Sequence, residues 1–283
     1  MMWITFAGKE LFRKKIVLIT CVLTLVFIML YSLGLWKISQ HMEGESGAPV
    51  YTLLEGVTAL TLGLLFAQMI AAFLVFFSTM GVISGEVESG LMLAQLARPI
   101  PRWKVYMGKY AGIACWMLLY NAILFWAILL PVHYLMNFPL FPLALMKAFL
   151  LFLLIPLLLL ALSLLGSTFL PTLGNGVACA MLYGLGLFSG FAENLFTLKQ
   201  PNLAINKVSM LISLLIPTDS LFHRLNYEII GGFDLPLNAE MLRSLGPFST
   251  INVPSVMFII YSIVYGALLL FLGCSAFRKK DIT

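Results

Sequence analysis

Six uncharged, apolar runs divide this sequence, and each is long enough to cross the hydrocarbon core of a lipid bilayer. A helix needs about 20 apolar residues to span a core of about 30 Å. The runs are residues 16–36, 56–83, 110–131, 148–170, 173–192 and 255–277. Only 10% of the 283 residues are charged, against about a quarter in soluble proteins. We therefore predict an all-α integral membrane protein with six transmembrane helices.

The basic residues indicate which ends of these helices face the cytoplasm. Eleven of the 17 Lys and Arg residues lie before the first span, after the second span and after the sixth span. These positions share one side of the membrane, and Lys and Arg concentrate on the cytoplasmic side. We therefore expect cytoplasmic N- and C-termini and a cytoplasmic segment at residues 84–109. The net charge of +5 follows from the same bias, so nucleic acid is not expected as a partner.

Two further segments are expected at the membrane surfaces. Residues 1–15 separate apolar from basic side chains, which predicts an interfacial helix, although a basic flank of the first span fits nearly as well. Residues 193–254 form a predicted external subdomain of helices. Within it, residues 203–216 are apolar but too short to span, so we expect an amphipathic helix that is either interfacial or partly inserted. Further helices are expected at residues 220–229 and from Asn238 onward.

The fifth predicted span contains a GxxxG pair, formed by Gly186 and Gly190. Two glycines one turn apart allow another helix to approach closely. The approaching helix can belong to the same chain or to a second copy, and the sequence leaves both possibilities open. We therefore predict helix packing or a dimer contact at these two positions.

The spans lack the side chains that several kinds of membrane protein need. No Asp, Glu, Lys, Arg or His lies in the middle of a predicted span, which disfavours an ion-coupled carrier, an intramembrane protease and a metal-dependent enzyme. We expect no catalytic residue and no metal site. The sequence also lacks a GxxxxGK[ST] loop, so any ATP that drives this protein would be bound in the P-loop manner by another polypeptide.

Residues 84–109, SGEVESGLMLAQLARPIPRWKVYMGK, form a polar island after the second span. Apolar side chains recur in it at helical spacing, at Val87, Leu91 and Ala94. Pro99 disfavours helix before it, and Pro101 keeps the backbone extended before Arg102 begins the next helix. We predict a short cytoplasmic helix that ends at a rigid corner joined to the third span. A solvated loop with ordinary cytoplasmic bases is the alternative interpretation.

The stretch ISGEVESGLMLAQLARPIPRWKVYMGKY resembles the segment after the second span of ABC-2 type permeases, the transmembrane subunits of ABC exporters. The shared features are two acids, a glycine, a short apolar helix, a Pro-containing corner with a following Arg, and a Gly-Lys pair. Leu91 departs from the Thr that this family often has. GKELFRKK, LLIPTDSLFHRL and FRKKDI are also similar to family features. The subgroup resembled includes the membrane subunit of the nitrous-oxide-reductase maturation system and many antibiotic or peptide exporters.

This resemblance implies a permease that moves a hydrophobic or amphipathic substrate across the bacterial cytoplasmic membrane. It implies pairing with a second copy or a similar paralogue, and two ABC ATPase subunits that bind ATP and Mg, while this chain binds no cofactor. The residues that would couple the chain to the ATPase are Glu86, Glu88, Gly90, Leu91, Leu93, Arg98, Pro99 and Arg102. The alternative is a membrane-anchored mechanotransducing or assembly subunit that an ATPase drives without substrate translocation.

Overall fold

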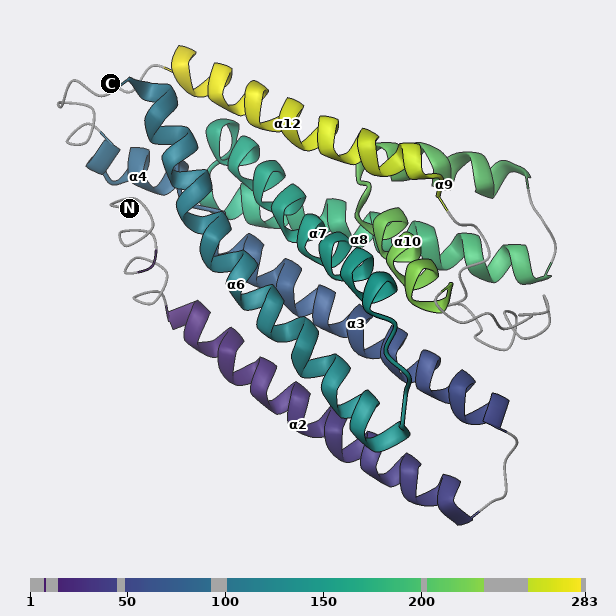
Figure 1. Ribbon diagram of the computed structural model, residues 1–283. Coiled ribbons are helices and arrows are strands. Elements are labelled where there is room, and N and C mark those ends of the chain that lie inside the picture. Colours follow the sequence, from purple (N-terminus) through teal and green to yellow (C-terminus); the bar gives the residue numbers. More distant parts are fainter. Residues whose placement is uncertain are drawn as a thin grey trace.

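The computed structural model describes residue 8 and residues 15–44, 49–92, 101–199, 203–231 and 254–280. Its regular structure is helical, and no strand occurs in these ranges (Figure 1). The helices are α2 (Lys15–Gly44), α3 (Pro49–Thr79), α4 (Ser84–Glu88), α6 (Arg102–Met136), α7 (Pro142–Phe169), α8 (Thr172–Lys199), α9 (Leu203–Leu215), α10 (Thr218–Ile230) and α12 (Val256–Lys279).

Six of the helical segments are long and apolar enough to cross a membrane. They are Val17–Gln40, Leu53–Glu88, Arg102–Met136, Pro142–Phe169, Thr172–Glu193 and Val256–Lys279. The predicted all-α class with six apolar helices of spanning length is therefore confirmed. The third of them begins at Arg102, directly after an extended Pro101 (φ −64°, ψ 134°), as the two prolines of the polar island predicted.

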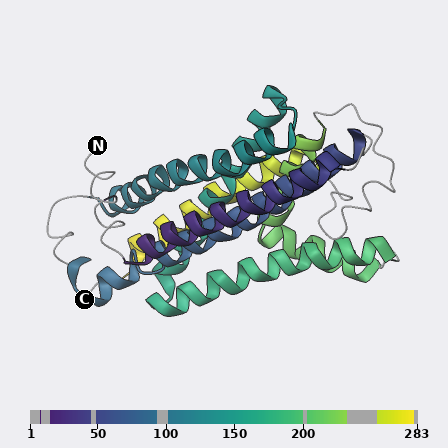
Figure 2. The same ribbon diagram turned by 90° about the horizontal axis from the view of Figure 1, so that it is seen from below.

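Helix α7 lies at the centre of the bundle, where it packs against α3, α6, α8, α10 and α12 (Figure 1). It is apolar on all sides, as expected of a helix surrounded by other helices, and Phe152, Ile155 and Leu160 are fully buried. Helix α2 instead leaves most of its apolar side chains exposed. Helices α8 and α9 lie side by side at one flank (Figure 2).

The short helices α9 and α10 lie beside the long helices rather than wholly beyond their ends (Figure 1). The hydroxyls of Tyr261 and Tyr265 on α12 donate to the carbonyls of Leu214 and Leu215, which end α9. Tyr265 is nine residues into α12, so this contact lies about 14 Å from the start of that helix. The structure therefore packs these two helices against the long helices, and the predicted external subdomain stays a prediction. The further helix expected from Asn238 lies outside the described residues.

The amphipathic pattern of α10 explains why this helix lies beside the long helices. Its apolar side chains Leu221, Phe222 and Leu225 are buried, and α10 makes its most extensive contact with α7. An ion pair supports this contact: Nζ of Lys147, near the start of α7, lies 3.3 Å from Oε2 of Glu228 on α10. Burial against α7 thus places α10 within the bundle.

The opposite end of the bundle holds α4, the start of α6 and the end of α12 (Figure 1). The loop between α7 and α8 reaches the same end, because Thr172 hydrogen-bonds to Glu88. Segments far apart in the sequence therefore meet around the polar island.

Candidate coupling site

The coupling region, residues 84–109, begins directly after a turn that follows α3, and α7 holds that turn. The buried hydroxyl of Ser167 accepts the backbone N–H groups of Ile83 and Ser84 at 3.1 and 3.0 Å. These are the first N–H groups of α4, which have no partner within their own helix. The end of α7 therefore fixes where α4 begins.

A second set of buried hydrogen bonds joins α3, α7 and α8 just inside this turn. Thr79 donates from its hydroxyl to the hydroxyl of Ser163 at 2.7 Å. The side-chain amide of Asn175 donates to the carbonyls of Met80 and Ser163 at 3.0 and 2.9 Å. Buried polar groups with partners hold neighbouring elements in one arrangement, so these bonds lock three long helices together next to the coupling region.

Glu86 forms an ion pair with Lys109, which lies on α6. Only 8% of the Lys109 side chain and 13% of the Glu86 side chain are exposed. The ammonium group also donates to the carbonyl of Val82 at 3.0 Å. A buried charge needs an opposite charge and hydrogen bonds, and this lysine has both. The pair connects α4 to the first turns of α6.

Glu88 connects the same region to α8. Its carboxylate accepts the backbone N–H of Thr172 at 3.3 Å and the Thr172 hydroxyl at 3.2 Å. Thr172 is the first residue of α8, where free N–H groups and the helix dipole favour a negative charge. Glu88 therefore acts as a cap supplied to α8 from a distant part of the chain.

Two basic side chains cap helix C-termini at this end. Arg102 donates through Nη1 to the carbonyls of Arg278 and Lys280 at 3.1 and 2.8 Å. Lys280 donates to the carbonyl of Thr168 at 2.8 Å. Cations suit helix C-termini, where carbonyls lack partners within the helix. Arg102 thus joins α6 to α12, and Lys280 joins α12 to α7.

Residues 89–91 form an exposed tip within the described stretch 84–92. The continuous helical spacing predicted through Val87 and Leu91 is wrong, because α4 ends at Glu88 and Gly90 has a φ of +72°. Glycine adopts this left-handed conformation without steric cost and commonly stops a helix. Beyond it, Leu91 is 59% exposed and Met92 is fully buried. The predicted coupling residues Leu93, Arg98 and Pro99 lie outside the described residues.

A family model described as ABC-2 family transporter protein matches residues 7–282. The chain belongs to the ABC-2 transporter family. The comparison with curated proteins gave no match.

Membership in the ABC-2 family makes this chain a permease subunit of an ABC transporter and a multi-pass membrane protein. The family also implies association with an ABC ATPase subunit. The chain is therefore a transport component rather than the ATP-hydrolysing subunit. The eight residues expected to couple it to the ATPase remain a prediction.

The GxxxG pair lies against helices of the same chain. An added Cβ at Gly190 would lie 1.8 Å from Oδ2 of Asp219, and one at Gly186 would lie 3.5 Å from the Ile216 side chain. The two glycines therefore let Ile216 and the first residues of α10 approach α8 closely. Of the two possibilities that the sequence left open, the structure provides packing within the chain.

Sequence reasoning missed four residues that organise the coupling site, namely Lys109 as an ion-pair partner, Ser167, Thr172 and Asn175. The sequence marks Lys109 as a cytoplasmic base and as part of the Gly-Lys pair of the family resemblance, but not as the partner of Glu86. Thr172 follows Pro171 at the start of a helix, a local signal for a cap position. No local signal points to Glu88 as its partner, because the two residues are 84 positions apart.

Proposed function

We propose that this chain is the permease subunit of an ABC exporter. It moves a hydrophobic or amphipathic substrate across the bacterial cytoplasmic membrane, using ATP hydrolysed by two copies of a separate ATPase subunit. The coupling region and both chain ends lie in the cytoplasm, which agrees with the basic residues gathered at that end. A second permease subunit, either identical or paralogous, completes the transporter.

The observation that carries this proposal is the arrangement of the coupling region. Its tip exposes Leu91, one of the residues that the family resemblance assigns to coupling with the ATPase. Its base is tied to α6 through Lys109 and to α8 through Thr172. A displacement of the tip by an ATPase would therefore move two spanning helices at once.

Substitution of the tip tests this proposal. Leu91→Asp puts a charge on the contact surface without disturbing a buried side chain, so we expect the ATPase to copurify poorly. Leu143→Asp is the matched control, because Leu143 is also exposed, at 70%, but lies at the start of α7 near the opposite end. Equal recovery of the ATPase with both variants would contradict docking at the tip.

Transport itself is measured in inverted vesicles that contain the permease and its ATPase. We expect ATP-dependent accumulation of lipophilic fluorescent compounds, and a loss of accumulation in the Leu91→Asp variant. ATP hydrolysis that the permease stimulates without accumulation of any compound would instead favour the mechanotransducing or assembly subunit.

A further inference from the structure

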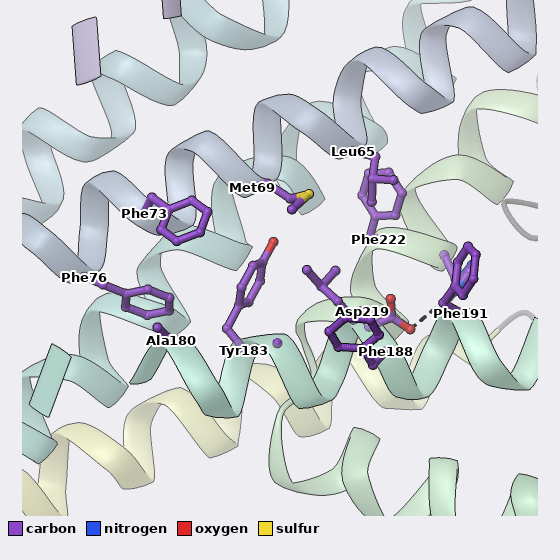
Figure 3. Close-up of a pocket in the computed structure, with 13 residues that line it drawn as sticks. Leu65, Met69, Phe73, Phe76, Ala180, Tyr183, Phe188, Phe191, Asp219 and Phe222 are labelled. Carbon is purple, nitrogen blue, oxygen red and sulfur yellow. Dashed lines mark ion pairs between the residues drawn. The ribbon is translucent and has the colours of Figure 1, made fainter. Parts of the chain in front are cut away.

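An apolar cavity of about 350 Å³ lies between α3, α8 and α10 (Figure 3). Six aromatic side chains dominate its wall: Phe73, Phe76, Tyr183, Phe188, Phe191 and Phe222. Phe73 and Phe188 are 45% and 76% exposed, so the cavity opens at the surface of the subunit between α3 and α8. A molecule dissolved in the membrane can enter by that route.

One side of the cavity carries polar groups. Asp219 and His223, one turn apart on α10, form an ion pair at 3.4 Å, and their side chains are 13% and 15% exposed. Tyr183 is only 4% exposed, and its hydroxyl has no hydrogen-bond partner among the described residues. This hydroxyl points from α8 into the cavity toward Met69 of α3 (Figure 3). A buried hydroxyl without a partner is costly, so a ligand that bonds to it would relieve that cost.

Most of the charged residues that line this cavity and its neighbour are acidic. A neighbouring cavity of about 380 Å³ shares Asp219 and His223 with the first and adds Glu193. Burial lowers the pKa of His223, but Asp219 and Glu193 raise it by more, so the net direction is upward. Even with the imidazole protonated, two carboxylates and one cation line the two cavities. The charged groups that line the two cavities therefore favour a positively charged ligand.

We propose that this cavity binds an amphipathic amine that is cargo of the transporter. The ammonium group lies at Asp219 and the Tyr183 hydroxyl, and the apolar body lies among the aromatic rings, whose faces also attract cations. The site lies within a single subunit. The statement that the bound amine is cargo rests on the proposed export function. Binding of the amine in the cavity requires no ATPase.

The binding test uses the full chain in phosphatidylcholine nanodiscs without the ATPase. The probe is a 12-carbon primary amine with a photoreactive diazirine at the far end of its chain. We expect labelling of peptides from α3 and α8, and at least about tenfold stronger competition by dodecylamine than by dodecanol or dodecanoate. Equal competition by the alcohol or the carboxylate would overturn the amine assignment.

Three variants locate the site. Asp219→Asn should remove the preference for the amine, and Tyr183→Phe should weaken labelling about fivefold. Gly184→Leu should abolish labelling, because Gly184 lines the cavity and an added Cβ there meets nothing within 4 Å. Gly34→Leu is its matched control, since Gly34 on α2 has equally open surroundings. Labelling that survives Gly184→Leu would place the amine elsewhere and overturn the proposal.

A transport assay separates failure of this site from failure of the proposed function. In vesicles with the ATPase, we expect ATP-driven accumulation of the amine that Gly184→Leu abolishes and Gly34→Leu retains. Transport of other lipophilic compounds without amine binding would overturn the amine site alone. Amine binding without ATP-driven accumulation of any compound would overturn the export function and the cargo assignment, while the binding site would stand.

Discussion

Lys109 and Glu86 form a charged pair that is largely buried in an apolar bundle. The lysine has the glutamate and the Val82 carbonyl as partners, so its charge is compensated where water has little access. Removing one partner of such a pair leaves the other charge buried, which costs far more than removing both.

Lys109→Met should therefore lower the free energy of unfolding by about 3 kcal/mol, measured by thermal or denaturant unfolding in detergent. The double variant Lys109→Met/Glu86→Gln should recover most of this loss. Lys104→Met is the control, because Lys104 is an exposed residue on the same helix. A loss no larger than that of Lys104→Met would contradict the structural role of the pair.

His223 makes stability depend on pH. Burial lowers its pKa, Asp219 and Glu193 raise it by more, and the folded-state pKa therefore lies above the ordinary value of 6.5. A raised pKa means that the folded state holds the proton more tightly, so this stabilisation is present below about pH 6.5 and is lost as pH rises through the folded-state pKa.

We therefore expect the unfolding temperature of the wild type to fall as the pH is raised from 6 toward 9. The unfolding temperature of the His223→Gln variant should fall less over the same range. An equal fall in both proteins would show that other groups cause the pH dependence. Thermal unfolding followed by intrinsic fluorescence measures the difference.

At the scale of elements, the start of α10 approaches α8 closely because Gly190 has no side chain. The Asp219 carboxylate occupies the position that a Cβ of residue 190 would take, and this carboxylate also pairs with His223. Any side chain at residue 190 must therefore displace a group that is already held in place.

Gly190→Ala should cost about 1–3 kcal/mol of unfolding free energy, the usual range for an overpacked site. Gly34→Ala, where the added Cβ meets nothing within 4 Å, should be neutral or slightly stabilising. If Gly190→Ala instead weakened association between subunits and left the stability of the single subunit unchanged, the glycine pair would act between copies. Unfolding and light scattering on the same samples distinguish these results.

At the scale of the whole molecule, the coupling region is attached to three long helices. Glu86 reaches α6, Glu88 reaches α8, and Ser167 of α7 holds the turn before them. Because α7 packs against most of the bundle, we expect a displacement of this region to reach the part of the bundle where α10 rests on α7.

Thr172→Val should uncouple the transporter without affecting ATPase docking. The variant keeps the shape of the side chain but removes the hydroxyl that donates to Glu88. We expect the amount of compound accumulated per ATP hydrolysed to fall about twofold to fivefold. The Thr172→Ser variant keeps the hydroxyl and should therefore keep the wild-type ratio of compound accumulated to ATP hydrolysed. If Thr172→Val left the amount of compound accumulated per ATP hydrolysed unchanged, the contact between Thr172 and Glu88 would not couple the movement of α8 to ATP hydrolysis.

The sequence by itself determined the class of the protein and the positions of its long helices. Runs of about 20 uncharged residues have few stable alternatives to a membrane-spanning helix, because the backbone must satisfy its own hydrogen bonds in lipid. The extended Pro101 and the start of α6 at Arg102 were also predictable, since a proline restricts the backbone at and before its own position.

Only the tertiary structure decided which residues meet. Glu88 and Thr172 are 84 positions apart, and nothing in their local sequence pairs them. The same holds for the fit of Asp219 against Gly190 and for the aromatic cavity, whose walls come from three helices. Local patterns specify a helix and its apolar faces, whereas the contacts between helices depend on how all the faces are buried together.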